Sequence, residues 1–403
     1  MTQPPLEVRV YDTLDALLTL QTEWEQLLSE FPTATTFSTL DWLLPWWRAF
    51  GSGQQLKVIA FFDSTQRLVA LAPLSLTNHR VASGVKLKLL RLMGDGSGDS
   101  DNLDLPVRPG YESAFVDALL DFLARGDIDW DFCQLNTLPH DSPAAAILMS
   151  RLKQRGCRQF TFERPWLVSN LPTSWEAYIG QLTSENRNNL KRYTRRLHRR
   201  YQVQIYKCTE AGDLNRCLED LFRLHQMRWQ LRGESGTFAS AERRAFYYDL
   251  SRALLANQCL EFWLLSLDGK TVAAQFCFRY RETVFLLQEG FDPDHAADRV
   301  GFILRGHVLE QLIAAGIGRY DFLFGQSPGK NIWVPQLQHY RNIHFAMRFG
   351  RGSLYLRFVN TARDSKEWLR AHLPEQVWTV LHGLNPKRRR AGGQKLAATR
   401  DAE

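Results

Sequence analysis

The stretch LEFWLLSLDGKTVAAQFCFRYRETVFLLQEGFDPDHAADRVGFILRGHVLEQLIAAGIGRYDFLFG (260–325) decides the fold of this chain. Three alternating apolar runs are followed by a loop with Gly301, a helix-like segment and a last apolar run over 319–325. This order predicts three strands joined by tight turns, then a helix and a return strand. Such a unit can bind an extended thioester cofactor along the third strand and its phosphates at the helix start. It therefore points toward acyl transfer.

The first part of the chain repeats this pattern. LKVIAFFDSTQRLVALAPL (56–74) resembles LEFWLLSLDGKTVAAQFCF (260–278), and each is followed by a helix-like stretch and a further strand. We therefore expect an α/β (α+β) protein with two mixed-sheet halves flanked by helices. The expected parts are a first half (6–165), a second half (166–350), a strand and helix extension (351–384, with the strand at 353–359) and a basic disordered tail (385–403).

Composition narrows the class of protein. The chain has 403 residues, 44% of them apolar, which is more than one hydrophobic core usually holds. It contains no apolar run of about 18 residues and no secretory signal. Six cysteines without a CxxC pair favour a reduced, cytoplasmic protein without disulfides or a zinc site. Alternating aspartates after Gly94 lack the spacing of a calcium loop, so we expect no metal site.

Positive charge is concentrated in two segments. Residues 185–200 carry seven Arg or Lys and one Glu, and Lys387 to Arg390 add four positive charges, within a net charge of +7. Such patches favour a nucleotide cofactor, RNA or an anionic membrane surface. A solvated helix packed by its apolar stripe explains 187–200 equally well. We expect no specific DNA binding.

Three further positions can carry chemistry. Glu289 lies at the end of the third strand in an apolar run, where a carboxylate can take the proton of an attacking amine. A neighbouring basic residue that neutralises it is the alternative. His225 and Arg228 share a helix face and suit an acceptor-binding wall, although a helical His is more often structural. Asp321 is a carboxylate inside a strand, with Asp131 as its counterpart in the first half, which suggests a shared structural role.

Together these residues resemble the GNAT acyltransferase superfamily, and within it the CelD/BcsL-like group linked to bacterial cellulose or exopolysaccharide production. This group is related to the Fem-type aminoacyltransferases, which carry two GNAT-like halves. The motifs that carry the resemblance are LHQMRW (224–229), VAAQFCF (272–278), GFDP (290–293), Gly301 and YDFLFG (320–325), followed by Lys330 and Trp333.

The resemblance implies a tandem GNAT fold with a degenerate first half and a second half that binds acyl-CoA, acetyl-CoA or a longer ester. The pantetheine arm would pair with 284–289, including Gln288, and the pyrophosphate would meet Arg299, Val300, Gly301 and Phe302. Glu289 would be the general base. Acceptor binding would fall to His225, Arg228, Trp229, Asp321 and Lys330. In the family's phosphate loop, Asp298 and Ile303 replace Arg or Gln and Gly or Ala.

The leading hypothesis is a cytoplasmic N-acyltransferase that acts on an amine or glycan acceptor in envelope or exopolysaccharide biosynthesis. Its donor would be acyl-CoA or a thioester on an acyl carrier protein. A second hypothesis is aminoacyl transfer from charged tRNA, supported by the basic segment. A third is a non-catalytic regulator that binds a polysaccharide synthase subunit, supported by the altered phosphate loop.

Overall fold

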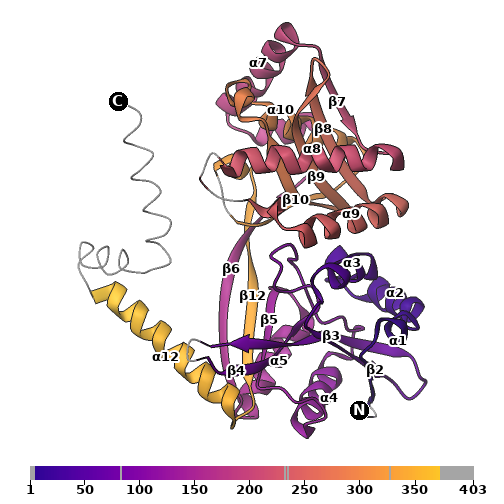
Figure 1. Ribbon diagram of the computed structural model, residues 1–403, viewed down its shortest axis with the longest axis vertical. Helices are drawn as coiled ribbons and strands as arrows, with labels where there is room; N and C mark the ends of the chain where they lie inside the picture. The colour runs from indigo at the N-terminus through magenta and orange to yellow at the C-terminus, as the bar shows by residue number, and fades with distance from the viewer. Residues whose placement is uncertain (1–4, 82–83, 231–232, 234–235, 326–327, 373–403) are drawn as a thin grey trace.

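The computed structural model describes residues 5–81, 84–230, 233, 236–325 and 328–372, and it contains one 12-stranded sheet. The strand order is β1-β2-β3-β4-β5-β12-β6-β11-β10-β9-β8-β7. The sheet therefore counts up through the first half and down through the second (Figure 1). This order confirms the mixed α/β fold with flanking helices.

The bounds of the elements follow the two predicted halves. The first half comprises β1 (Glu7–Tyr11), α1 (Leu14–Leu18), α2 (Gln21–Glu30), α3 (Leu40–Phe50), β2 (Gln55–Phe62), β3 (Leu68–Arg80), β4 (Lys86–Leu92), α4 (Glu112–Arg125), β5 (Phe132–Pro139), α5 (Pro143–Gln154) and β6 (Arg158–Asn170). The rest comprises α6 (Trp175–Gln181), α7 (Ser184–Arg200), β7 (Val203–Lys207), α8 (Ala211–Gln230), α9 (Ala241–Ala256), β8 (Leu260–Leu267), β9 (Lys270–Tyr280), β10 (Thr283–Phe291), α10 (Val300–Ala314), β11 (Arg319–Phe324), α11 (Pro328–Asn331), β12 (Gln336–Ala346) and α12 (Arg351–His372).

The two halves exchange their last strands. β12 comes from the end of the second half, yet it lies between β5 and β6, and β6 in turn lies between β12 and β11. β6 and β12 pair along their length, from Gln336↔Val168 to Ala346↔Arg158, and run between the two lobes (Figure 1). The expected boundary near Arg164 and Pro165 lies inside this continuous strand.

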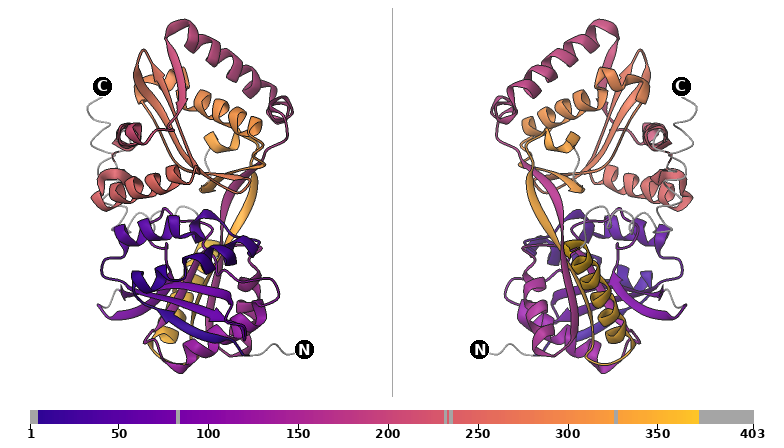
Figure 2. Two further views of the ribbon diagram at one scale, coloured as in Figure 1. Left: turned by 90° about the vertical axis from the view of Figure 1, so that its right-hand side faces the viewer. Right: turned by 90° about the vertical axis from the view of Figure 1, so that its left-hand side faces the viewer.

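Aromatic side chains join the halves on one face of the sheet. Trp42 of α3 packs edge-on against Phe246 of α9, with ring centroids 5.3 Å apart, and lies 5.4 Å from Phe278 of β9. Phe37, just before α3, meets both Phe278 and Phe285. Figure 2 shows the two lobes stacked along the long axis of the molecule. One hydrophobic core thus extends from α1 to β10.

The hairpin repeat is confirmed as β2–β3 and β8–β9, each later followed by a helix and a strand. The strand expected over 353–359 is wrong, because this segment begins helix α12. Gly352 explains the placement of that helix. A Cβ built on Gly352 would lie 1.7 Å from the carbonyl oxygen of Asp131, so the first turn of α12 packs directly on the backbone before β5.

Candidate functional site

β10 and β11 diverge in the second half of the chain. Their parallel pairing covers only Thr283–Phe285 opposite Arg319–Asp321. β10 then has a bulge between Leu286 and Gln288 and continues beside β9 as far as Phe291. A bulge bends and twists its strand, which accounts for the separation. The edge of β10 that faced β11 is thus released from sheet pairing after Phe285, as the strand-bound cofactor hypothesis requires.

Glu289 lies in the diverging part of β10 and forms an ion pair with Arg305 of α10. The side chain of Arg305 is 5% exposed and that of Glu289 is 34% exposed. The guanidinium of Arg305 also lies 5.4 Å from the ring centroid of Phe322 on β11. The alternative that a basic residue neutralises Glu289 therefore describes this conformation. Sequence reasoning missed Arg305, although a charge within the apolar run GFILRGHVL was a usable signal.

His225 lies on the other side of β10. The pairs Glu289↔Gln275 and Gly290↔Ala274 alternate between faces, so Glu289 faces α10 and Gly290 faces α8. A Cβ on Gly290 would lie 2.7 Å from the backbone nitrogen of His225, which shows how closely α8 approaches the strand. The two proposed catalytic side chains therefore approach the site from different faces.

The imidazole of His225 belongs to an aromatic cluster. It is buried, and its Nε2 accepts a hydrogen bond of 2.9 Å from the indole Nε1 of Trp229. Phe238 packs edge-on against it at 4.9 Å. These contacts orient the ring within α8 and agree with a structural role. The side chain of Arg228 lies outside the described residues.

The start of α10 presents the residues expected to bind pyrophosphate. Arg299 adopts a left-handed conformation (φ 59°) and precedes the helix, which opens with Val300, Gly301 and Phe302. A Cβ on Gly301 would approach only Phe291, at 3.8 Å, so its surroundings are open. The first backbone amides of a helix have no partner within the helix. The structure thus provides the backbone geometry of an anion site at this end.

A carboxylate lies beside this helix start. Asp298 is 5% exposed and its Oδ1 accepts from Arg200 of α7 at 2.8 Å, with Arg196 at 3.6 Å. Its Oδ2 accepts from the hydroxyl of Tyr201 at 3.3 Å and lies 3.2 Å from Nδ1 of His295. Asp298 therefore joins α7 to the end of the loop before α10, at the position where the family pattern has Arg or Gln.

Gln288 faces the first half instead of the β10 edge. Its side chain hydrogen-bonds the phenol of Tyr247 in α9, and that hydroxyl lies 3.3 Å from Oδ1 of Asp99. Arg243 of α9 pairs with the same carboxylate oxygen at 3.2 Å. Burial raises the pKa of Asp99 to about 6. A polar chain thus connects the third strand of the second half to the loop after β4, which sequence analysis considered only as a mobile loop.

Asp321 belongs to the same polar region between the halves. It is 3% exposed, and its Oδ1 accepts from the backbone nitrogen of Leu323 at 2.7 Å. Burial, and secondarily the carboxylate of Asp101, raise its pKa to about 7. Asp101 in turn accepts from the backbone nitrogen of Phe324 at 3.1 Å, and burial raises its pKa to about 6.

The shared role expected for Asp131 and Asp321 is not observed. Asp131 precedes β5 and accepts from the backbone nitrogen of Lys88 at 2.7 Å, whereas Asp321 is the third residue of β11.

Lys330 closes the turn after β11. Its Nζ donates to the carbonyl oxygens of Phe322 (2.8 Å), Phe324 (3.1 Å) and Gly325 (3.1 Å). Three acceptors match the three N–H donors of an ammonium group. Lys330 therefore holds the loop that follows the diverging strand in this conformation.

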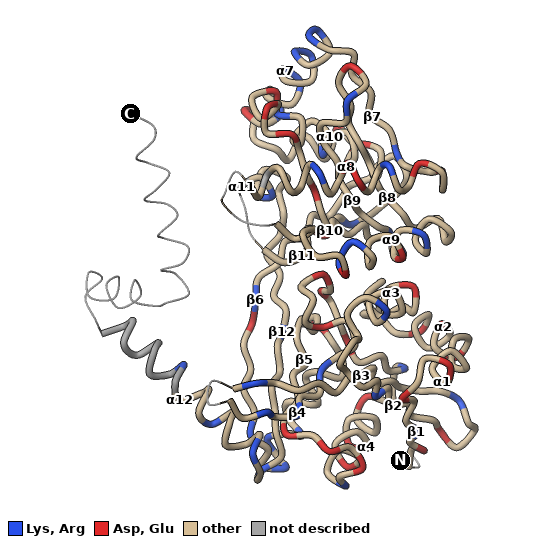
Figure 3. Tube along the Cα trace, viewed as in Figure 1, with Lys and Arg blue, Asp and Glu red and all other residues tan. Residues whose placement is uncertain are grey.

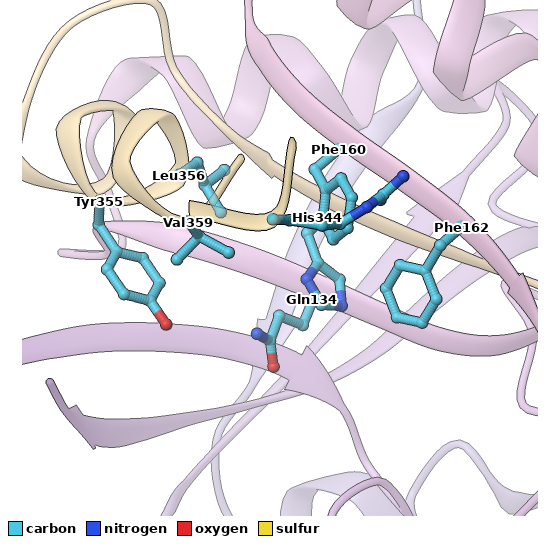
Figure 4. A pocket seen from close by; sticks show the side chains of 8 residues that line it. Gln134, Phe160, Phe162, His344, Tyr355, Leu356 and Val359 are labelled. Atoms are coloured by element: carbon cyan, nitrogen blue, oxygen red, sulfur yellow. The ribbon is translucent and has the colours of Figure 1, made fainter. Parts of the chain in front are cut away.

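A separate cavity of about 420 Å³ lies between α12 and the exchanged strands (Figure 4). Phe160 and Phe162 of β6 form one wall, and Tyr355 with Leu356 of α12 forms another. His344 lines it and lies 2.9 Å from Oδ1 of Asn136, and burial lowers its pKa to about 4. No residue predicted from the sequence as a site residue lines this cavity.

The comparisons with known proteins agree with this geometry. Residues 184–331 match the family model described as an acetyltransferase (GNAT) domain. None of the curated proteins matches the chain in sequence. Within the residues that the structure describes, no helix combines the length and apolar character needed to cross a membrane.

Solved structures resemble the whole described fold. A crystal structure of FemX has a TM-score of 0.61 and 11% identity, covering 85% of this chain and 98% of that chain. A conserved protein of unknown function from Bacteroides thetaiotaomicron has a TM-score of 0.53 and 13% identity, covering 84% and 100%. A tandem GNAT protein from the clavulanic acid biosynthesis pathway has a TM-score of 0.43 and 11% identity, covering 86% and 99%. The chain thus carries a GNAT-type acyltransferase domain within a fold like that of FemX.

Proposed function

We propose that this chain is an N-acyltransferase that moves an acyl group from a thioester donor beside β10 to an amine acceptor between the two halves. The observation that carries the proposal is the divergence of β10 from β11 beside Glu289 and Arg305. An extended donor can pair with the released edge of β10 as an additional strand. This placement would bring the thioester carbonyl to the level of Glu289.

The reaction follows from this arrangement. The amine nitrogen attacks the thioester carbonyl carbon, a C–N bond forms and the C–S bond breaks. The sulfur leaves as a thiolate that becomes a thiol on gaining a proton. Glu289, directly or through a water, takes the proton that the nitrogen loses. Arg305 is a positioning residue, since its guanidinium fixes the carboxylate of Glu289.

The polar region between the halves suits an amine acceptor. Asp99, Asp101 and Asp321 are brought together there from the loop after β4 and from β11. Carboxylates in a region of low dielectric attract a cation strongly. An acceptor with a protonated amine would therefore be drawn to this region before it loses its proton to the base.

Envelope or exopolysaccharide biosynthesis, including cellulose, is the context that we propose for the reaction. This part rests on the resemblance to the CelD/BcsL-like group, which is carried by motifs such as LHQMRW (224–229) and YDFLFG (320–325). The acceptor would then be an amino sugar or another amine-bearing precursor. The donor would be acyl-CoA or a thioester on a carrier protein.

Aminoacyl transfer from charged tRNA is the second candidate. It is supported by the cationic surface of α7, where Lys191, Arg192, Arg195 and Arg199 point to a phosphate-rich partner. In that case the donor would be an ester instead of a thioester. Attack by the amine and proton removal by Glu289 would be unchanged.

The test is a transfer assay with mass-spectrometric detection of the product. Acetyl-CoA, a longer acyl-CoA and charged tRNA are each mixed with a panel of amino sugars and free amines. Formation of an amide from a CoA ester supports the first proposal, and an aminoacylated product formed only from charged tRNA supports the second. No product, together with stable co-purification of a polysaccharide synthase subunit, would favour the regulator hypothesis and overturn both.

A further inference from the structure

The usual place for an anion in this domain already holds a negative charge. The amides at the start of α10 are suited to phosphate, yet the buried carboxylate of Asp298 lies beside them and is paired with Arg196 and Arg200. A second negative group at the same place would be repelled by Asp298. The phosphates of a nucleotide donor therefore need a different cationic surface.

α7 provides such a surface next to α10. Four of its cations form no ion pair within 4 Å in the described part of the chain: Lys191, Arg192, Arg195 and Arg199. The only acidic residue of the helix is Glu185, in its first turn. Figure 3 shows α7 as a Lys- and Arg-rich helix at one end of the molecule. A helix that served only as a solvated face would be expected to carry acidic partners at i+4 spacing.

Two hollows adjoin these cations. One, of about 560 Å³, is lined only by α7 side chains: Asn188, Lys191, Arg192, Arg195, Arg196, Arg199 and Arg200. The other, of about 320 Å³, lies between α6, α7 and α10. Lys191 and Arg195 line both hollows. They therefore stand where the two spaces meet.

The second hollow is apolar on one side and basic on the other. Trp175, Ile179, Leu190 and Ile303 give it an apolar wall, while Arg187, Lys191 and Arg195 form its rim. Gly306 makes the close approach of the helices possible, because a Cβ there would lie 2.9 Å from Leu190. A flat, mostly apolar base with attached phosphates matches this combination of surfaces.

We propose that this site binds a phosphorylated adenosine, with the base against the apolar wall and the phosphate on Lys191 and Arg195. The inference rests on the proposed function, since two candidate donors carry this group: CoA has a 3′-phosphoadenosine, and a charged tRNA ends in adenosine on a phosphate backbone. The site lies beside α10, whose Arg305 contacts Glu289, so one helix connects nucleotide binding to the proposed base.

The experiment is calorimetric titration of the full chain with CoA, 3′-dephospho-CoA and uncharged tRNA. Arg195→Glu and Lys191→Glu are the test variants, because both residues are exposed and line both hollows. Arg357→Glu is the matched control, since it reverses one exposed helical charge on α12. A charge-assisted hydrogen bond contributes enough for its loss to weaken binding about tenfold or more. Thermal melting verifies that each variant is folded.

Weaker binding of CoA in both test variants, unchanged binding in the control and little effect on 3′-dephospho-CoA would identify the CoA phosphate as the ligand. Weaker binding of tRNA with a reduced salt dependence, and no effect on CoA, would identify the tRNA end instead. Donor binding that both test variants leave unchanged overturns the α7 site while the proposed function stands. A wild-type protein that binds none of the three probes overturns both proposals.

Discussion

Arg305 of α10 forms a buried ion pair with Glu289, the residue of β10 that follows the bulged segment. Replacing Glu289 by Gln should lower turnover by about 10²-fold or more, because the amide cannot accept the proton from the amine. Donor affinity should change little, since Gln keeps the size and hydrogen-bonding oxygen of the side chain. Single-turnover rates and calorimetric titration measure the two effects separately. Unchanged turnover would remove Glu289 as the base.

Glu289→Ala is expected to lose stability in addition to activity. It would leave the guanidinium of Arg305, which is 4% exposed, without this carboxylate. Breaking a buried pair is costly, but the 34% exposure of Glu289 reduces the effect, so we expect about 1–3 kcal/mol relative to Glu289→Gln. Urea unfolding measures the difference. Equal stability of the two variants would show that the pair contributes little to the fold.

Gly290 is predicted to tolerate no side chain. In Gly290→Ala the new methyl group would lie 2.7 Å from the backbone nitrogen of His225 and 2.9 Å from the carbonyl carbon of Leu224. Backbone cannot move aside as a flexible side chain can, so α8 would be displaced from β10 at a cost of about 1–3 kcal/mol. Thermal denaturation should show a clear loss of stability.

Gly301→Ala is the matched control for that substitution. Its Cβ would meet only Phe291 at ordinary contact distance, 3.8 Å, and the residue lies in the first turn of α10. Alanine favours helix over glycine by up to about 1 kcal/mol, so this variant should be as stable as wild type or slightly more so. A comparable loss of stability in both variants would argue against the close packing of α8 on β10.

The parts of the fold that follow from the sequence are those formed by neighbours along the chain. The hairpins around Asp63 and Asp268 have alternating strands and a turn between them, so their pairing is local. The insertion of β12 between β5 and β6 joins residues about 200 positions apart, such as Phe345 and Cys133, and no local pattern indicates it. SLYLRFV (353–359) alternates like a strand, yet it is helical because its packing on the backbone of Asp131 decides the conformation.

The candidate site was predicted in part for a similar reason. Glu289 was found because a carboxylate is conspicuous in an apolar strand, and the same argument applied to the apolar helix would have found Arg305. The network of Asp99 with Tyr247 and Arg243 depends on the contact between the halves. That contact is a tertiary property, and composition or periodicity cannot reveal it.

The buried carboxylates between the halves predict that stability falls as pH rises. In the folded chain the pKa of Asp321 is raised to about 7 by burial, whereas an unfolded aspartate ionises near pH 4. Between these values the folded state holds a proton that the unfolded state has lost. This stabilisation is complete below about pH 4 and is lost as pH rises through about 7, at up to about 1.4 kcal/mol per pH unit.

Asp321→Asn should remove this contribution while its Oδ1 still accepts from the backbone nitrogen of Leu323. The variant should therefore gain stability relative to wild type between pH 4.5 and pH 8, as measured by urea unfolding at several pH values. Asp213→Asn, at a carboxylate 52% exposed in α8, is the control and should leave the pH dependence unchanged. Parallel curves for wild type and Asp321→Asn would contradict the assignment.

The strand exchange predicts that the two halves unfold together. β12 completes the sheet beside β5, and β6 completes it beside β11, so neither half keeps all its strand pairs without the other. The aromatic contact of Trp42 with Phe246 adds a shared core. We expect one calorimetric transition whose measured enthalpy equals the van 't Hoff enthalpy. A fragment that ends at Arg164 should aggregate, because it would expose the edge of β5 that β12 covers. Two separate transitions, or a soluble and cooperatively folded fragment, would show instead that each half is stable alone and that the exchanged strands only connect them.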